Sequence, residues 1–364
     1  MSRIVAAMSG GVDSSVAAAL LAREAAETGT EVVGVWMRTH GIDPEGHELR
    51  RSCCSPDALD DARRVAGILN IPFFVLNVER EFGTRVIDAF VDAYLGGATP
   101  NPCQACNQHI KFDELLRRGL AVYGAEAVAT GHYARIERGE DGAYHLLRAA
   151  DAAKDQTYFL WVLDQQQLAA TRFPLGELTK PLVRAIAAEI GLPTAAKPES
   201  QEICFVPLGD YRELLAERRG YAGEPGPIVD ADGTRIGTHT GYAHYTVGQR
   251  HGLGVALGEA VYVREVRPDT NTIVIGARDE VAQRSFTADG ARFIAGGPPA
   301  ERFEATVRIR HRAPDVRSEV TMVGAERFVV EAAEPMWAPA PGQAAVLYAG
   351  DECLGGGRIA RAAP

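Results

Sequence analysis

The chain has 364 residues, of which 46% are hydrophobic, and its formal net charge is -10. This composition excludes a disordered, collagen-like or coiled-coil protein and predicts a globular protein of two or three domains. The apolar stretches are far shorter than the ~18–20 residues of a membrane span, and no signal-peptide core follows Arg3, so we expect a cytoplasmic protein without membrane contact. The acidic charge argues against coating nucleic acid by bulk attraction, but it allows a local basic binding face.

Strand-like and helix-like segments alternate over the first 206 residues. In chain order we expect a strand at Ile4–Ala7, a helix at Ser14–Ala26, a strand at Glu31–Met37, a helix at Leu59–Leu69, a strand at Ile71–Val78, a helix at Val86–Tyr94 and a strand at Ala125–Thr130. A further helix is expected to have Thr179 as its N-cap and Gly191 after its end. This alternation predicts an α/β domain with a doubly wound parallel sheet, which binds ligands at the carboxyl ends of its strands.

The pattern changes after residue 206, where glycine and turn signals become frequent and the predicted strands become shorter. We expect an α/β domain over residues 1–206, a small central β-rich domain over 207–280 and a β-rich C-terminal domain over 281–364, with a hairpin at Val261–Gly276 before the second boundary. Alternation within Thr306–Arg312 predicts a strand that carries the guanidiniums of Arg308, Arg310 and Arg312 on one face.

A glycine-rich loop, Ser9-Gly10-Gly11-Val12-Asp13-Ser14-Ser15, lies between the first predicted strand and the first predicted helix. Its glycines let backbone N–H groups converge, its serines add hydroxyl donors, and the N-terminus of the following helix favours an anion. The loop is therefore a candidate phosphate cradle. It lacks the Lys-Ser/Thr pair of the Walker A motif, so transfer of a γ-phosphate is not expected. It resembles the PP-loop of the ATP pyrophosphatases, which cleave ATP between the α- and β-phosphates.

The chain has six cysteines, too few for a disulfide scaffold in a protein of this length. In a reducing compartment, clustered cysteines suggest catalysis or metal binding. We expect Cys353 to be structurally inert, whereas Cys53 and Cys54 fit either an inert or a metal-binding role.

Three other cysteines are candidates for chemistry. Cys103 and Cys106 follow a proline-restricted loop, and Cys204 lies in a separate segment. A thiol becomes a nucleophile in a positive or hydrogen-bonding environment, which His109 and Lys111 could supply to Cys106.

Further motifs occur in register with the glycine loop along almost the whole chain. They are Asn101-Pro102-Cys103-Gln104-Ala105-Cys106-Asn107, Thr130-Gly131-His132-Tyr133-Ala134-Arg135, Lys154-Asp155-Gln156-Thr157-Tyr158-Phe159-Leu160, Ser200–Phe205, Tyr245-Thr246-Val247-Gly248-Gln249-Arg250, Pro341–Val346 and Leu354–Gly357. Together with the glycine loop they resemble the tRNA-specific 2-thiouridylase family. The resemblance implies a Rossmann-like N-terminal domain of the adenine nucleotide alpha hydrolase type and a C-terminal β-barrel.

The resemblance also implies a sulfurtransferase that uses ATP to replace the C2 oxygen of the wobble uridine of tRNA with sulfur. A pyrimidine carbonyl oxygen is a poor leaving group, so ATP converts it into an adenylate and releases pyrophosphate; sulfur then attacks C2 and AMP leaves. By resemblance, Mg2+ lies between Asp13 and the phosphates. The implied ATP-binding residues are Ala7, Met8, Ser9, Gly10, Gly11, Val12, Asp13, Ser14, Met37 and Gly131.

The same resemblance assigns roles to the cysteines. Cys204 receives sulfur as a persulfide from a sulfur-donor protein, and Cys106 attacks that persulfide, which leaves a Cys106–Cys204 disulfide. Many family members carry an acidic residue where this chain has Cys103. Either that acid is dispensable, or Cys103, Cys106 and Cys204 ligate one iron–sulfur cluster (4Fe–4S) whose open iron carries the sulfur.

Positions that resemble family contacts to tRNA or to the flipped wobble base occur in both halves of the chain. They are Asn101, Pro102, Cys103, His132, Lys154, Asp155, Gln156, Arg310, His311 and Gln343. Tyr158, within the same motif, fits a core position equally well.

Two other functions compete with this interpretation. A PP-loop synthetase that adenylates a small molecule would use the glycine loop, but it leaves Cys106, Cys204 and the arginine-bearing β half without a role. A zinc-stabilised RNA-binding protein would use Cys53, Cys54, Cys103 and Cys106 as ligands, but it lacks the usual paired CxxC spacing and leaves the phosphate cradle unused.

Overall fold

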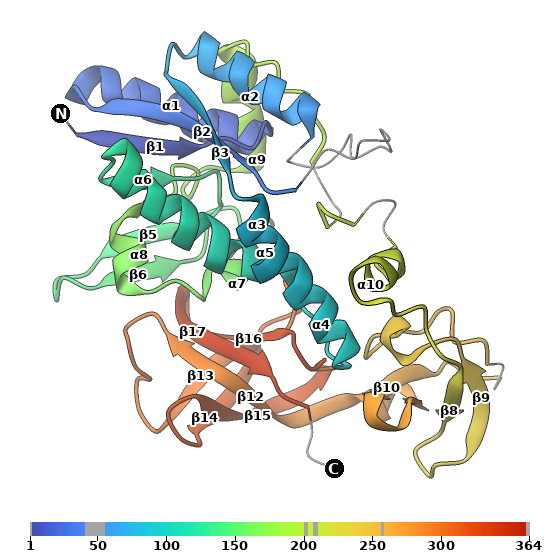
Figure 1. Ribbon diagram of the computed structural model, residues 1–364. Coiled ribbons are helices and arrows are strands. Elements are labelled where there is room, and N and C mark those ends of the chain that lie inside the picture. The colour runs from blue at the N-terminus through green and yellow to red at the C-terminus, as the bar shows by residue number, and fades with distance from the viewer. Residues whose placement is uncertain (1, 41–54, 200–202, 207–209, 256–257, 362–364) are drawn as a thin grey trace.

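The computed structural model describes residues 2–40, 55–199, 203–206, 210–255 and 258–361 (Figure 1). These residues form a five-stranded sheet in the N-terminal part, a four-stranded sheet in the middle of the chain and an eight-stranded sheet that contains the C-terminal strands. Among the helices of the described residues, none is both long enough and apolar enough to cross a membrane.

The N-terminal sheet is parallel, with the order β3-β2-β1-β4-β7. Its strands are β1 (Arg3–Ala7), β2 (Glu31–Arg38), β3 (Phe73–Asn77), β4 (Ala127–Ala129) and β7 (Thr171–Arg172). The four strands expected from the sequence are present, which confirms the doubly wound sheet, whereas β7 was not expected. The strand order reverses between β1 and β4, which is where sheets of this type bind their ligands.

Helices cover both faces of this sheet (Figure 1). Successive residues of a strand point to opposite faces. Ile4 and Ala6 therefore pack in the cluster formed with α1 (Val12–Thr28), α2 (Pro56–Ile68) and α9 (Lys180–Glu189), whereas Val5 packs in the cluster on the other face. That other face is covered by α3 (Glu79–Phe82), the π-helical turns η1 (Gly83–Asp88), α4 (Ala89–Leu95), the π-helical turns η2 (Asn107–Leu115) and α6 (Leu116–Tyr123).

Three short helices complete this half of the chain, namely α5 (Pro102–Cys106), α7 (Thr157–Leu160) and α8 (Gln165–Ala169). The predicted ends of the last long helix are confirmed, because α9 follows Thr179 as its N-cap and Gly191 has a positive φ of 76° just after it.

The central sheet has the order β10-β11-β8-β9. It consists of β8 (Gly226–Val229), β9 (Arg235–His239), β10 (Tyr262–Arg267) and β11 (Thr272–Gly276), with α10 (Arg212–Arg219) before it, the short 3-10 turns η4 (Tyr242–His244) and η5 (Pro268–Thr270) within it and α11 (Arg278–Val281) after it. The expected hairpin at Val261–Gly276 corresponds to the antiparallel pair β10 and β11.

The C-terminal strands close into an antiparallel barrel. The order is β12-β15-β14-β13-β16-β17, and β17 pairs with β12 to complete the ring. The strands are β12 (Ala282–Phe293), β13 (Arg302–Arg308), β14 (Val316–Met322), β15 (Arg327–Trp337), β16 (Ala344–Ala349) and β17 (Glu352–Ile359). Val307, Val320 and Phe328 are fully buried among them. This confirms the β-barrel that the family resemblance implied.

A hairpin from the N-terminal part of the chain extends the barrel sheet. β5 (Arg135–Arg138) and β6 (Tyr144–Leu147) are antiparallel, and β6 pairs with β17 at Leu146–Cys353 and Leu147–Glu352. Residues 135–147 thus belong to the same sheet as residues 282–359, although more than a hundred residues separate them in the sequence.

The strand expected over Thr306–Arg312 is wrong in its second half, because β13 ends at Arg308. Ala313 N donates to Arg310 O at 3.0 Å and closes a turn, and Pro314 has no N–H with which to continue a ladder. The three arginines of this segment therefore do not share one strand face.

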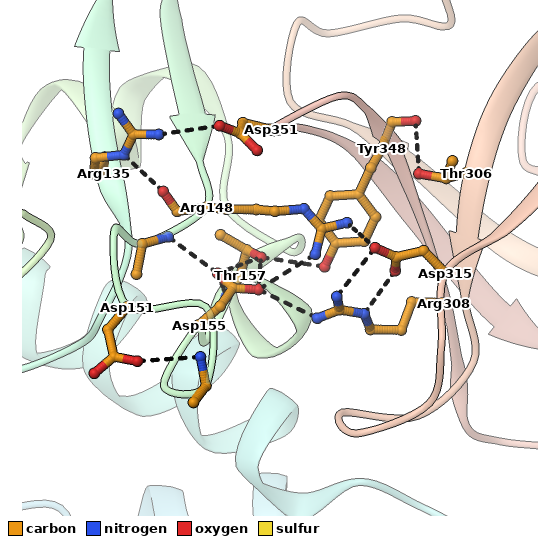
Figure 2. A network of polar contacts seen from close by, with 12 residues as sticks. Arg135, Arg148, Asp151, Asp155, Thr157, Thr306, Arg308, Asp315, Tyr348 and Asp351 are labelled. Carbon is orange, nitrogen blue, oxygen red and sulfur yellow. Dashed lines mark hydrogen bonds and ion pairs between the residues drawn. The ribbon is translucent and has the colours of Figure 1, made fainter. Parts of the chain in front are cut away.

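A buried ionic network joins the barrel to the N-terminal half (Figure 2). Asp155, which is 3% exposed, precedes α7 and accepts hydrogen bonds from the Thr157 amide at 3.3 Å and the Thr157 hydroxyl at 2.9 Å. Its Oδ2 lies 3.3 Å from Arg308 Nη1, at the end of β13, and 3.7 Å from Arg148 Nη1.

The two arginines of this network share a second carboxylate. Asp315 Oδ1 lies 2.8 Å from Arg308 Nε, and its Oδ2 lies 2.8 Å from Arg148 Nη2. The Arg148 guanidinium also stacks 3.7 Å above the ring of Tyr348. Two carboxylates thus balance two guanidiniums where the α/β domain contacts the barrel.

We expect Asp155→Ala to lower the free energy of unfolding by about 3 kcal/mol, because it leaves two guanidiniums, each on a side chain that is only 14% exposed, with one carboxylate between them. Asp351→Ala is the matched control: this carboxylate lies 3.5 Å from Arg135, but its side chain is 72% exposed. The control should lose less than about 1 kcal/mol. Chemical denaturation of both variants measures the difference, and equal losses would contradict a structural role for Asp155.

Candidate active site

The glycine loop joins β1 to α1. Gly10 has a φ of 72°, and a Cβ atom there would lie 2.1 Å from Ala58 O of α2, so the position excludes any side chain. Ser14 Oγ accepts from Ser9 N at 3.1 Å and donates to Gly11 O at 3.1 Å, which fixes the shape of the loop. The N-cap of α1 is Gly11, which has no side chain to accept hydrogen bonds from the first N–H groups of the helix. These N–H groups can therefore donate to a bound anion.

The two other predicted nucleotide-binding positions lie at the same edge of the sheet. Gly131 follows β4, and a Cβ atom there would lie 2.7 Å from Ser14 N, so its backbone packs directly against the glycine loop. Met37 lies near the end of β2, the strand beside β1, and is half-buried. The predicted ATP-binding residues are therefore gathered at the carboxyl ends of β1, β2 and β4, around the point where the strand order reverses.

Asp13, in the first turn of α1, is held by two donors from distant parts of the chain. The Tyr133 hydroxyl donates to Asp13 Oδ1 at 2.7 Å, and Lys180 Nζ lies 2.7 and 2.8 Å from the two carboxylate oxygens. Burial and the hydrogen bond to Asp13 raise the pKa of Tyr133 far above its usual range, so its hydroxyl stays protonated. Lys180, at the start of α9, is buried.

A second carboxylate, that of Glu199, lies on the other side of Lys180. Glu199 Oε1 is 2.6 Å from Lys180 Nζ, and its Oε2 is 2.7 Å from Lys154 Nζ. Burial opposes ionisation of this carboxylate, but the hydrogen bonds from Lys154 and Lys180 outweigh it and lower the pKa of Glu199 to about 2. Asp13, Lys180, Glu199 and Lys154 thus form a continuous chain of ion pairs beside the glycine loop.

Lys197 makes a separate contact with the loop. Its Nζ donates to Gly10 O at 2.9 Å and to Asp61 Oδ2 at 2.6 Å. Lys180, Lys197 and Glu199 were not expected at the site from the sequence. One signal in the sequence is that all four lysines lie at or before Lys197, whereas the chain after Lys197 has arginines but no lysine.

The helix α5 carries two of the candidate cysteines. Asn101 caps it by accepting hydrogen bonds from Cys103 N at 3.2 Å and Gln104 N at 3.3 Å, and Gln104 Nε2 donates to Tyr158 O at 3.2 Å. Cys103 is exposed, whereas Cys106, at the end of the helix, is half-buried.

Cys106 and Cys204 pack against the same apolar cluster, which contains Phe82, Phe90 and Phe205. Both cysteines are half-buried there. The structure thus brings the predicted sulfur-transfer pair to one region of the fold, although the two residues come from distant segments.

Among the described residues, no group of three His, Cys, Asp or Glu side chains could hold a metal ion. Cys103, Cys106 and Cys204 all belong to the described part of the chain. The iron–sulfur alternative for these three thiolates stays a prediction.

Of the remaining three cysteines, the structure describes Cys353. Cys353 is fully buried in the barrel, and burial raises the pKa of its thiol, as an inert cysteine requires. Cys53 and Cys54 lie outside the described residues.

Burial, with Arg85 and other nearby arginines, lowers the pKa of His109, which disfavours the charged form of its ring. That His109 or Lys111 gives Cys106 a positive or hydrogen-bonding environment stays a prediction. Lys111 Nζ lies 3.3 Å from His132 Nε2 and is directed toward that ring.

Three of the predicted tRNA contacts are buried, namely Pro102, in the first turn of α5, and the polar residues His132 and Asp155. His132 is 8% exposed, its Nδ1 lies 2.7 Å from Thr130 Oγ1, and burial with the charge of Lys111 lowers its pKa well below 6.5. Asp155 is satisfied within the network between the domains. Since tRNA would have to displace these partners to reach either side chain, the structure favours supporting roles for both.

The predicted contact Gln343 lies between the barrel and α5. Gln343 Nε2 donates to Thr99 O at 2.9 Å and Pro100 O at 3.3 Å, and Thr99 N donates to Pro341 O at 2.7 Å. The barrel therefore holds the loop that leads to Asn101, and through it the position of α5.

Gln156, Arg310 and His311, three further predicted tRNA contacts, lie near α7. Arg310 Nη2 donates to Ala338 O at 2.7 Å, and the His311 ring centroid is 4.7 Å from that of Phe159. Gln156 Oε1 accepts from Tyr133 N at 2.9 Å. Tyr158 is fully buried, as a core residue.

Comparison with known families gives three consecutive matches. They are the tRNA methyl transferase HUP domain over residues 2–208, the tRNA methyl transferase PRC-barrel domain over residues 212–277 and the aminomethyltransferase beta-barrel domain over residues 283–359.

Individual relatives match at full length. The chain is 49% identical over 360 residues to the tRNA-specific 2-thiouridylase MnmA of Carboxydothermus hydrogenoformans, covering 98% of this chain and 97% of the relative. It is also 49% identical to the protein of the same name from Chloroflexus aurantiacus, covering 99% of each chain. The protein belongs to the tRNA-specific 2-thiouridylase family.

Proposed function

We propose that this protein uses ATP to replace the C2 oxygen of the wobble uridine of tRNA with sulfur, giving 2-thiouridine, AMP and pyrophosphate. The observation that carries the proposal is the presence, in one α/β domain, of a phosphate cradle and a pair of cysteines on a shared apolar cluster. Full-length relatives named as tRNA-specific 2-thiouridylases support it.

In the first step the cradle binds the β- and γ-phosphates of ATP while the uridine C2 oxygen attacks the α-phosphorus. The bond between the α-phosphorus and the bridging oxygen breaks, and pyrophosphate leaves. The N–H groups of Gly10, Gly11 and the first turn of α1 would stabilise the negative charge of the departing group. The residues proposed for ATP are Ala7–Ser14, Met37 and Gly131.

Asp13 is the residue that would hold Mg2+ together with the phosphates. Mg2+ in such sites uses one or two carboxylates and takes its other ligands from substrate oxygens and water, so a single protein carboxylate is enough. The ion would offset the phosphate charge.

In the second step Cys204 carries the sulfur as a persulfide supplied by a sulfur-donor protein. The Cys106 thiolate attacks the inner sulfur of that persulfide, a Cys106–Cys204 disulfide forms, and hydrosulfide leaves. Hydrosulfide attacks C2 of the adenylated uridine, and AMP departs with the former C2 oxygen. A thiol reductant then returns both cysteines to the reduced state.

This proposal is favoured over its rivals by the extent of the resemblance. A synthetase for a small molecule would use the cradle, but the relatives match the barrel and the central domain as well. The domain matches carry a methyltransferase description, yet the PP-loop and the paired cysteines fit thiolation. We place the reaction in the cytoplasm, with tRNA and the sulfur donor as its partners.

Incubation with unmodified tRNA, ATP, Mg2+ and a persulfide source, followed by nucleoside analysis, tests the proposal. We expect 2-thiouridine with the wild type and none above the enzyme-free background with Cys106→Ala or Cys204→Ala, because each lacks one thiol of the transfer pair. Cys353→Ala is the matched control and should keep its activity, since this buried thiol lies in the barrel. Thiolation by Cys204→Ala would contradict the assignment.

We also propose that the exposed Arg312, in the turn after β13, contacts a tRNA phosphate beside Arg310 and His311. Arg312→Glu should weaken tRNA binding and reduce the slope of log K against log salt by about 1, because one phosphate contact is lost. ATP affinity should not change. Arg317→Glu, on β14 with its side chain 80% exposed, is the matched control. Equal effects of the two reversals on tRNA binding would argue against the contact.

A further inference from the structure

Lys111 differs from the other lysines in having no carboxylate partner within the described part of the chain. It is half-buried, and the polar contact of its ammonium group there is His132 Nε2 at 3.3 Å. Each of the other three lysines lies within 2.7 Å of a carboxylate oxygen, in the pairs Lys154–Glu199, Lys180–Asp13 and Lys197–Asp61. Because charges that are withdrawn from water are normally paired, Lys111 is suited to an anion that comes from outside the chain.

The His132 ring holds this ammonium group without neutralising it. An ammonium group has three N–H donors and no acceptor, so His132 Nε2 must accept, and the ring proton lies on Nδ1, which donates to Thr130 Oγ1 at 2.7 Å. Burial of the ring lowers its pKa well below 6.5, in keeping with a neutral acceptor. Lys111 therefore keeps its positive charge while His132 fixes the direction of its side chain.

Lys111 connects the segment beside the glycine loop with the helix that carries Cys106. His132 follows Gly131, whose backbone packs against Ser14 N of the glycine loop. Lys111 belongs to η2, which begins directly after Cys106. Hydrogen bonds in π-helical turns join residues five apart, so Lys111 lies one turn beyond Cys106.

The part of ATP that must lie between the cradle and the cysteines is the α-phosphate. Its phosphorus is bonded to pyrophosphate before the first step and to the uridine oxygen after it. The cradle already offers N–H groups to the β- and γ-phosphates, and the lysines beside it, Lys180 and Lys197, are already paired with carboxylates. The α-phosphate is therefore the anion that Lys111 is placed to meet.

We infer that Lys111 is a catalytic residue that binds a non-bridging oxygen of the α-phosphate, and that His132 is the positioning residue that directs it there. While the bond from the uridine oxygen to phosphorus forms and the bond to pyrophosphate breaks, the ammonium group neutralises negative charge on the non-bridging oxygens. Lys111 keeps its proton throughout. In the second step it stays on the phosphate that leaves as AMP. The inference rests on the proposed function and adds to it a residue for the α-phosphate.

The test is isothermal titration calorimetry without tRNA, with AMP, adenosine and inorganic pyrophosphate, each in the presence of Mg2+. AMP carries the α-phosphate, adenosine lacks it, and pyrophosphate represents the group that the cradle holds. We expect Lys111→Met to weaken AMP binding by about tenfold or more, which corresponds to one hydrogen bond between charged groups. The affinities for adenosine and pyrophosphate should stay as in the wild type.

Lys111→Arg keeps a positive donor and should recover part of the lost AMP affinity, which a role in packing alone would not explain. Arg85→Met is the matched control. It removes a positive charge from the neighbouring η1, but Arg85 already has a carboxylate partner, Asp113 Oδ2 at 2.7 Å. This variant should therefore bind AMP as the wild type does.

Two results would overturn the inference alone: equal AMP affinity of the wild type and Lys111→Met, or a loss of pyrophosphate affinity as large as the loss of AMP affinity, because Lys111 would then serve the cradle. Failure of the proposed function is recognised separately. A wild type that binds neither AMP nor ATP would contradict the proposed function and, with it, the role of Lys111.

Discussion

The contact between Lys180 and Asp13 is the interaction on which the site depends. It joins the start of α9 to the first turn of α1, and the Tyr133 hydroxyl adds the segment after β4 to the same carboxylate. Three elements that are far apart in the sequence therefore meet at one side chain of the glycine loop. This convergence requires glycine at residue 131, which packs directly against Ser14 N. Any side chain there would separate β4 from the loop.

The barrel contributes to the site from a distance. Its residue Gln343 holds the backbone of Thr99 and Pro100, which fixes the loop before α5, and the buried pair of Asp155 with Arg308 holds α7 against the barrel. The hairpin β5–β6 continues the barrel sheet into the α/β half. Hydrogen bonds and a shared sheet therefore fix the position of Cys106 relative to the barrel. A mutation at this boundary should disturb both the position of α5 and the stability of the protein.

Features that depend on local sequence were predictable. The strands β1 to β4 of the parallel sheet coincide with short apolar runs, whereas β7, with only two residues, has no such run. The glycine loop follows from the strand–loop–helix pattern, and the α9 boundaries follow from Thr179 and Gly191. The strand end at Arg308 was missed because alternation continues through Ile309 and Arg310, while the turn closed by Ala313 determines where the strand stops.

Features that depend on partners distant in the sequence were not predictable from residue types. Asp155 has a side chain typical of a surface, and its burial is offset by Arg308, which comes from another segment. The His132 ring packs against Phe112 and Phe173, which also come from other segments. The position of Lys180 beside Asp13 also depends on a distant partner. The sequence pattern of α9 does not indicate which carboxylate its first residue, Lys180, will contact. Pairing of β6 with β17 likewise leaves no periodic signal in either strand.

The central claim is that Cys204 delivers sulfur and Cys106 releases it. The most direct measurement is a single turnover without reductant, in which enzyme loaded with persulfide reacts with tRNA and ATP and the cysteine peptides are identified by non-reducing mass spectrometry. The account predicts that a Cys106–Cys204 disulfide accumulates in step with 2-thiouridine. Formation of 2-thiouridine while both thiols stay reduced would contradict it.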